Sequence, residues 1–274
     1  MTRAGTAIVG AGLRADRSGR DPLTELPPIS LADVLAAAEL QTRTDRKYLL
    51  RADQVSPLLT AADGLLVLDI DGRRAFRYES VYFDTAELLA YQQAARGRRR
   101  RFKIRTRSYL DSGQCALEVK TVGGRDQTVK DRLDYPIGDR NRLNSDGLAF
   151  VAGRVALPDA GRELTPALTT TYLRSTLVDP AEGARLTIDA DLICADPTGG
   201  RTGLCGHVVV ESKSAGPPTM VDRLLWRQGI RPARISKYCV GLAVLDPALP
   251  ANRWNRTLRR YFDWRPSPGG RNHS

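Results

Sequence analysis

The residues best suited to chemistry are basic and recur at every second position of the segment 99–108. Successive side chains of a strand point to opposite faces, so this spacing places cations on one face and Phe102 and Ile104 on the other. The cationic positions are Arg99, Arg101, Lys103, Arg105 and Arg107. Like charges along one face repel one another unless an anion offsets them. The segment therefore predicts a binding site for a polyanion.

Five further segments repeat this division between ionic and apolar side chains. Their ionic positions include Glu118, Lys120, Lys130, Arg132, Arg174, Asp189, Asp191, Glu211 and Lys213. The solvated face of an ordinary antiparallel sheet accounts equally well for any single strand of this kind. The local density favours the polyanion, because eight of the twelve residues from Arg96 to Arg107 are basic.

The composition narrows the function classes. The chain has 274 residues and a formal charge of +11, which points to nucleic acid, an anionic membrane surface or a phosphate-rich molecule as partner. Its apolar runs are too short to span a bilayer, and a signal peptide is lacking, so a cytoplasmic location is expected. Four scattered cysteines and two histidines make a zinc site unlikely and indicate free thiols.

Hydrophobic periodicity predicts strands that must position these side chains. We expect strands around 43–50, 65–70, 74–84, 99–109, 115–121, 128–136, 169–178, 185–193 and 207–214. We expect helices at 53–61, 85–95, 144–152, 219–228 and 237–245, a further helical run after Ser30, and Thr219 as an N-cap. Residues 1–28 are predicted to be a flexible leader, 29–250 the main domain, and 251–274 a helical or disordered tail.

The hairpin order of the strands favours an α+β fold built on a mainly antiparallel sheet or barrel. If the sheet closes with its ionic face inward, the cations line a tunnel and the apolar faces are covered outside by helices. Low-dielectric walls would focus the field of such a lining on a phosphate chain.

At these residues the sequence resembles the catalytic domain of the vacuolar transporter chaperone (VTC) polyphosphate polymerases, members of the triphosphate tunnel metalloenzyme superfamily. The matching segments, in order, are Arg46–Tyr48, Ser80–Thr85, Lys103–Tyr109, Leu117–Lys120, Lys130–Arg132, Thr171–Arg174, Thr187–Asp191, Val210–Lys213 and Arg234–Tyr238.

The resemblance implies an eight-stranded antiparallel barrel and transfer of the ATP γ-phosphate to a growing polyphosphate chain with Mn²⁺ or Mg²⁺. The implied catalytic residues are Arg105, Arg107, Lys120, Arg174 and Lys237. The implied substrate-binding residues are Lys47, Lys103, Lys130, Arg132, Lys213 and Arg234. The metal ligand would be Glu211, with Glu118, Asp189 and Asp191 as further candidates, although the two aspartates could equally neutralise arginines.

Departures from the family leave alternatives open. Hydrolytic relatives carry Glu-x-Glu-x-Lys on the first strand, where this chain has a single carboxylate, Asp45, before Lys47. This favours the polymerase, with tripolyphosphate or nucleoside triphosphate hydrolysis and non-catalytic binding of polyphosphate or nucleic acid as alternatives. Specific nucleic acid binding is not expected, because aromatic residues do not interleave with the cations. Lipid binding ranks last. A membrane-protein partner, which would hold the chain at the inner face of the membrane, is an expectation from the family alone.

Overall fold

The computed structural model describes residues 21–36, 44–122, 128–157 and 163–266. Most of the expected leader lies outside these ranges. The chain divides into two compact units. Unit 1 comprises Met1–Ala75, Ser175–Asp191 and Cys205–Arg231, and unit 2 comprises Phe76–Arg174, Leu192–Leu204 and Pro232–Ser274.

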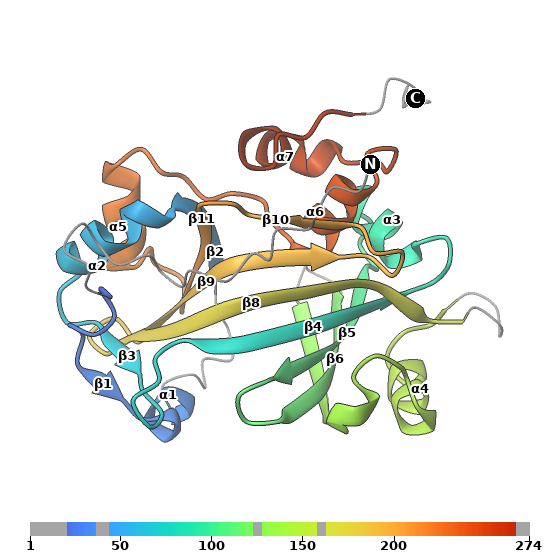
Figure 1. Cartoon of the computed structure of the whole chain (residues 1–274), viewed down its shortest axis with the longest axis horizontal. Helices are drawn as coiled ribbons and strands as arrows, with labels where there is room; N and C mark the ends of the chain where they lie inside the picture. Colours follow the sequence, from blue (N-terminus) through green and yellow to red (C-terminus); the bar gives the residue numbers. More distant parts are fainter. Residues whose placement is uncertain (1–20, 37–43, 123–127, 158–162, 267–274) are drawn as a thin grey trace, which may run out of the picture. The chain divides into compact units, whose positions relative to one another are not determined.

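Unit 1 is built on strands that bury one face under two helices. Its strands are β1 (Pro28–Ile29), β2 (Thr44–Arg51), β3 (Leu66–Leu68), β11 (His207–Ser214) and parts of β8 (Thr165–Asp179) and β9 (Ala184–Ala195). Its helices are α1 (Leu31–Ala36), α2 (Val55–Ala61) and α5 (Met220–Arg227), with a 3₁₀ turn at Ala52–Gln54. Tyr48, Val210 and Ile188 pack with Leu58 of α2 and Leu225 of α5 (Figure 1). Leu23 also lies in this core.

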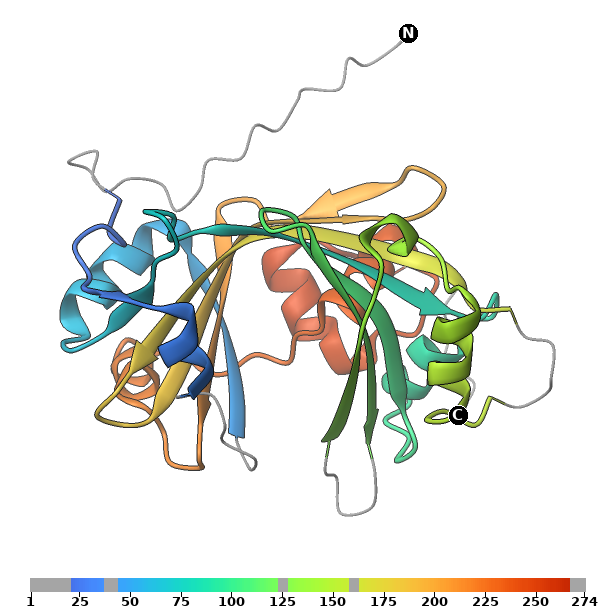
Figure 2. The same ribbon diagram turned by 90° about the horizontal axis from the view of Figure 1, so that it is seen from below.

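Unit 2 contains the longest run of hairpins. Its strands are β4 (Phe76–Asp84), β5 (Phe102–Tyr109), β6 (Gln114–Val122), β7 (Thr128–Asp134), β10 (Arg201–Gly203) and the remainders of β8 and β9. Its helices are α3 (Leu89–Ala95), α4 (Ser145–Ala152), α6 (Lys237–Leu245) and α7 (Asn255–Tyr261), with 3₁₀ turns at Ile137–Asp139 and Asn252–Trp254. In Figure 2, α4 lies against one face of the green strands. That face is apolar, because Ile104, Leu117 and Val119 pack with Val151 of α4.

The strand order is β2-β11-β9-β8-β4-β5-β6-β7, with β1, β3 and β10 paired off this path. The pairings are antiparallel except for β1 with β3, which is parallel. The predicted antiparallel sheet with helices is therefore confirmed. The predicted eight-stranded closed barrel is not: the sheet has eleven strands, and among the described residues no hydrogen bonding joins the end strands β2 and β7.

The helix boundaries follow from capping. Thr219 is the N-cap of α5, as predicted, and forms a capping box with Asp222. Ser236 caps α6, where its side chain accepts a hydrogen bond from the Cys239 amide. The expected tail helix is present as α7, and its Leu258 is fully buried. None of the helices that the structure describes has the length and apolar character needed to cross a bilayer.

Candidate functional site

Three lysines stand side by side on the ionic face of unit 2. Lys103 of β5 is the direct cross-strand partner of Lys120 of β6, which is in turn the direct partner of Lys130 of β7. Cβ atoms of such partners lie about 4.5–5.5 Å apart, and like charges directly opposite each other are destabilising. The register thus places three ammonium-bearing side chains in one row.

Lysine is rare in this chain, and most of the lysines lie on strands. Of the 42 basic residues only six are lysines, and the remainder are arginines. Five of the six, Lys47, Lys103, Lys120, Lys130 and Lys213, lie on strands, and Lys237 is the first residue of α6. All six are among the residues expected from the sequence to bind phosphate.

The next row of the same face centres on a buried carboxylate. Glu118, with no exposed surface, is the cross-strand partner of Arg105 on one side and Arg132 on the other. Its Oε2 accepts hydrogen bonds from Nε and Nη2 of Arg105 at 2.9 and 2.7 Å and lies 3.5 Å from Nη2 of Arg107. Its Oε1 lies 2.7 Å from Nζ of Lys130. Glu118 therefore orients three cations of the face.

These contacts determine the protonation state of the carboxylate. Burial alone raises the pKa of Glu118, but the charges and hydrogen bonds of Arg105 and Lys130 outweigh burial and lower the pKa to about 2. The carboxylate is thus ionised at neutral pH and paired with cations of the protein.

A third row carries buried polar atoms that lack a protein partner. Ser80 of β4 is the cross-strand partner of Arg107 on β5 and of Thr170 on β8. In the described part of the chain, Ser80 Oγ, Arg107 Nε and Thr170 Oγ1 are buried and have no hydrogen-bond partner. Unsatisfied buried donors are rare in native proteins. Two hydroxyls and a guanidinium N–H in adjacent strands suit the oxygens of an anion.

Three tyrosines form the next row of the same face. Tyr172, Tyr78 and Tyr109 follow one another across β8, β4 and β5, with ring centroids 5.5 and 5.0 Å apart. The Arg174 guanidinium lies 5.1 Å from the Tyr78 centroid, and Nζ of Lys237 lies 4.6 Å from that of Tyr172. The rings thereby hold two of the predicted catalytic cations by cation–π contact.

Tyr82 and Ser236 each hydrogen-bond to a cation of the ionic face. Tyr82 accepts a hydrogen bond from Nη1 of Arg105 at 3.0 Å, and its ring stacks on that of Tyr238 at 5.0 Å. The Tyr238 hydroxyl donates to the fully buried Asp84. At the start of α6, Nζ of Lys103 donates to Ser236 Oγ at 2.8 Å. Arg234 lies two residues before this cap and hydrogen-bonds through its carbonyl to Thr257 of α7.

Unit 1 carries its own ionic face, on β2, β11 and β9. Glu211 is the cross-strand partner of Lys47 and Thr187, and its Oε1 lies 3.1 Å from Nζ of Lys47 and 3.6 Å from Nζ of Lys213. Lys213 is in turn partnered by Asp45 and Arg185. Positive and negative side chains alternate here, in contrast to the lysine row of unit 2.

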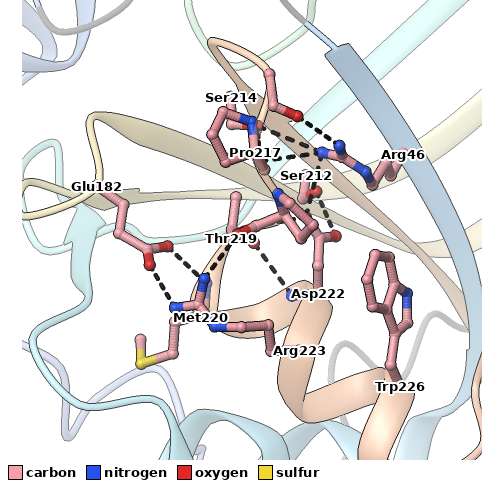
Figure 3. A network of polar contacts seen from close by, with 12 residues as sticks. Arg46, Glu182, Ser212, Ser214, Pro217, Thr219, Met220, Asp222, Arg223 and Trp226 are labelled. Carbon is pink, nitrogen blue, oxygen red and sulfur yellow. Dashed lines mark hydrogen bonds and ion pairs between the residues drawn. The ribbon is translucent and has the colours of Figure 1, made fainter.

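A buried network on the opposite face of β2 and β11 holds this register (Figure 3). Asp222 of α5 accepts hydrogen bonds from Tyr48 and Ser212 at 2.7 Å each and forms an ion pair with Arg46 at 3.4 Å. Trp226 donates to the Tyr48 hydroxyl at 3.0 Å. Because Arg46 and Tyr48 flank Lys47, the network fixes the strand that presents this lysine.

The predicted carboxylates are not grouped into a cluster of three or more among the described residues. Asp189 is buried opposite Val209, Asp191 has a φ of 52°, and Glu211 faces two lysines. Glu118 is occupied by arginine and lysine. Across the described ranges, no three His, Cys, Asp or Glu side chains are grouped so that they could hold a metal ion. The residues present do not fit a divalent cation bound by protein ligands alone.

Several residues of this site were missed from the sequence. Tyr78 and Tyr172 share the period-two phase of the polar positions on their strands, a signal that could have identified them. Ser80 and Thr170 share that phase too, but a serine or threonine within a strand is not distinctive. Ser236, Asp84 and Asp222 act across long sequence separations that periodicity does not report.

Comparison with protein-family models gives one match. The model of the VTC domain family matches residues 42–246. No curated protein matches the chain.

Solved structures give weaker similarity. A putative adenylyl cyclase from Hippeastrum, described as having a dominant triphosphatase activity, is 15% identical over 73% of this chain and 94% of that chain, with a TM-score of 0.47. A conserved hypothetical protein from Pyrococcus furiosus is 12% identical over 72% of this chain and 99% of that chain, with a TM-score of 0.40.

Proposed function

Because the chain belongs to the VTC domain family, we propose that it extends inorganic polyphosphate by transferring the γ-phosphate of ATP to the polymer. The observation that carries the proposal is the row formed by Lys103, Lys120 and Lys130. The row places three ammonium groups in register, of which Lys130 is already ion-paired with Glu118. A chain of phosphates carries one negative charge after another along its length and so suits such a row.

The rows of unit 2 offer the donors that phosphoryl transfer requires. Arg107 has a planar guanidinium suited to phosphate contacts, and Arg105 would contact phosphate with the N–H groups that Glu118 and Tyr82 leave over. The lysines act as compact point charges. The buried donors Ser80 Oγ and Thr170 Oγ1 add neutral hydrogen bonds to phosphate oxygens. Arg174 and Lys237, held against Tyr78 and Tyr172, extend the cationic surface toward β8. Positioning and charge neutralisation account for most of the catalysis in this reaction class.

The proposed phosphoryl transfer requires no nucleophile from the protein. A terminal oxygen of the polymer attacks the γ-phosphorus of ATP and forms a new phosphoanhydride bond. The bond between that phosphorus and the bridging oxygen breaks, and its electron pair leaves with ADP. Each turnover lengthens the polymer by one phosphate. Arg105, Arg107 and Lys120 would neutralise the three equatorial oxygens of the transferred group.

The metal expected from the family enters no step of the proposed transfer, since no three carboxylates of the described residues are grouped as a protein-only site. ATP would be supplied as its Mn²⁺ or Mg²⁺ complex. The chain's own residues bind and orient the phosphates.

The test is incubation of the full chain with ATP and Mn²⁺, followed by electrophoresis of the products. We expect a ladder of polyphosphate together with one ADP for each phosphate incorporated. Lys120→Ala should abolish the ladder, whereas Arg142→Ala, at an exposed arginine of the loop before α4, should retain it. Release of inorganic phosphate without a ladder would show a hydrolase, and binding of polyphosphate without turnover would show a binding protein; either result contradicts the proposal.

A further inference from the structure

Two arginine-rich segments of unit 2 lie against each other outside the rows described above. The first is the turn between α3 and β5, and the second begins at the 3₁₀ turn Asn252–Trp254 and continues into α7. Gly97 of the first has a φ of 65°, and a side-chain carbon at this glycine would collide with the guanidinium of Arg253. Glycine therefore permits a cation of the tail to rest on the basic turn.

Apolar contacts hold the tail in this place. Trp254 is 7% exposed, and its ring lies 5.8 Å from that of Tyr91 on α3. The Tyr91 hydroxyl donates to the Pro250 carbonyl at 3.2 Å, and Leu258 is fully buried. The helices are shown in Figure 1. The juxtaposition of the two segments thus rests on packing rather than on charge.

The same tail connects to the end of the lysine row. Thr257 of α7 donates to the Arg234 carbonyl at 3.1 Å, and Ser236, two residues further on, accepts the hydrogen bond of Lys103. On the other side, the basic turn runs directly into β5, where Lys103 is the second residue. Both arginine-rich segments are therefore connected to Lys103, the tail through hydrogen bonds and the basic turn through the chain itself.

The arginines of these segments face solvent and have few acidic neighbours in sequence. We define the arginine surface as Arg98, Arg99, Arg100, Arg253, Arg256 and Arg260, all of which are exposed. The sequence contains no Asp or Glu from 88 to 110 and none from 247 to 262. Arg256 and Arg260 are spaced i, i+4 and so share one side of α7. Exposed guanidinium groups on two segments that meet at Gly97 and Arg253 repel unless a polyanion neutralises them.

We propose that the arginine surface binds the part of a polyphosphate chain that extends beyond the Lys103 end of the strand rows. This inference rests on the proposed function and adds a second contact region for the polymer. The tail arginines lie beyond residue 246, where the match to the family model ends. The surface would favour long chains over short ones, because only a long chain reaches both regions.

The surroundings favour polyphosphate over nucleic acid or lipid. Binding of single-stranded nucleic acid relies on aromatic rings that stack on bases, but Trp254 and Trp264 are each only 7% exposed. Membrane-surface helices insert an apolar face, but Leu258 of α7 is buried in the protein. One ring accompanies these guanidinium groups, since Arg260 lies 5.4 Å from the ring centroid of the half-buried Tyr261. A surface with six exposed guanidinium groups and no fully exposed ring suits a polymer that consists only of phosphate.

The test compares binding of tripolyphosphate and of polyphosphate about a hundred residues long to the full chain by calorimetry at low salt. The surface variant carries Arg99→Gln and Arg256→Gln, and the matched control carries Arg142→Gln and Arg227→Gln at exposed arginines elsewhere. We expect the surface variant to lose about fivefold in affinity for the long chain, with a shallower salt dependence, and to keep its affinity for tripolyphosphate. The control should match the wild type for both ligands.

Equal affinity of the two variants for long polyphosphate would overturn the inference. So would tighter binding of a single-stranded RNA of equal charge, or of anionic vesicles, that is lost in the surface variant. Polymer synthesis by the wild type separates the two proposals. A wild type that makes polyphosphate while the surface variant binds it normally refutes only the arginine surface, and a wild type that makes none refutes the proposed function.

Discussion

Lys103 and Lys120 are direct cross-strand partners on β5 and β6, so two cations of the same face stand opposite each other. Lys130 continues the row on β7. A pair of like charges at such positions costs stability in the absence of a ligand, and an anion that binds both reverses the sign of the effect. The pair therefore links folding stability to phosphate binding.

Replacement of the central lysine tests this link. Lys120→Gln should leave the ligand-free protein within about 0.5 kcal/mol of wild-type stability, because the lost contacts are offset by relief of repulsion. The rise in melting temperature produced by tripolyphosphate should fall sharply, since stabilisation by a ligand follows its affinity. Thermal unfolding with and without tripolyphosphate measures both quantities. An undiminished ligand-induced shift would contradict a phosphate-binding role for this row.

Glu118 should make stability depend on pH. Its pKa is lowered to about 2 in the folded protein, below the ordinary value of 4.5. A lowered folded-state pKa contributes stability that is present above the unfolded-state value and is lost as the pH falls through the folded-state value. Glu118→Gln should therefore cost about 3 kcal/mol at pH 7, and the difference from wild type should shrink between about pH 4.5 and pH 2.

Urea unfolding across this pH range measures the difference. Asp134→Asn is the matched control on the neighbouring strand, since the Asp134 side chain is 95% exposed. It should change stability by less than about 0.5 kcal/mol. A Glu118→Gln difference that stays constant from pH 7 to pH 2 would show that the pKa of the carboxyl group is the same in the folded and unfolded states, which contradicts the lowered folded-state pKa.

Two buried strand serines should respond in opposite ways to loss of the hydroxyl. Ser80 Oγ has no protein partner among the described residues, so Ser80→Ala should be neutral or slightly stabilising while it weakens binding of tripolyphosphate. Ser212 Oγ donates to Asp222 at 2.7 Å, so Ser212→Ala should cost about 1–3 kcal/mol. Chemical unfolding and calorimetric titration distinguish the two. Equal destabilisation by both changes would contradict the idea that the Ser80 hydroxyl is kept for a ligand.

The packing of α6 against its neighbours should depend on a single glycine, Gly241. A Cβ at Gly241 would lie 2.8 Å from Cδ2 of Leu168 and 2.9 Å from Sγ of Cys194. Gly241→Ala should destabilise the protein by about 1–3 kcal/mol and, by shifting the helix that carries Lys237, weaken phosphate binding. Gly153→Ala, where the new carbon makes only ordinary contacts at 3.7 and 3.9 Å, is the control. Thermal melts that do not separate the two variants would argue against tight packing of α6.

Local patterns in the sequence were sufficient to predict most of the elements and the division of each strand into two faces. Side chains alternate along any extended strand, so the cationic positions of β5 share one face whatever the strand pairs with. Capping at Thr219 and the apolar positions of the tail are equally local. The short strands β1 and β10 were not predicted, because two or three residues carry no measurable period.

Only the tertiary structure decided which ionic residues meet. Register aligns Lys103, Lys120 and Lys130 in one row. It also brings Arg105 and Lys130 onto Glu118, a carboxylate that the family resemblance offered as a candidate metal ligand. Register depends on the turns and on burial of the opposite face, neither of which is encoded at the charged positions themselves. The strand pattern likewise left an open sheet and a barrel as alternatives, and the closed barrel was implied only by the resemblance. Closure depends on hydrogen bonds between strands that are distant in the chain.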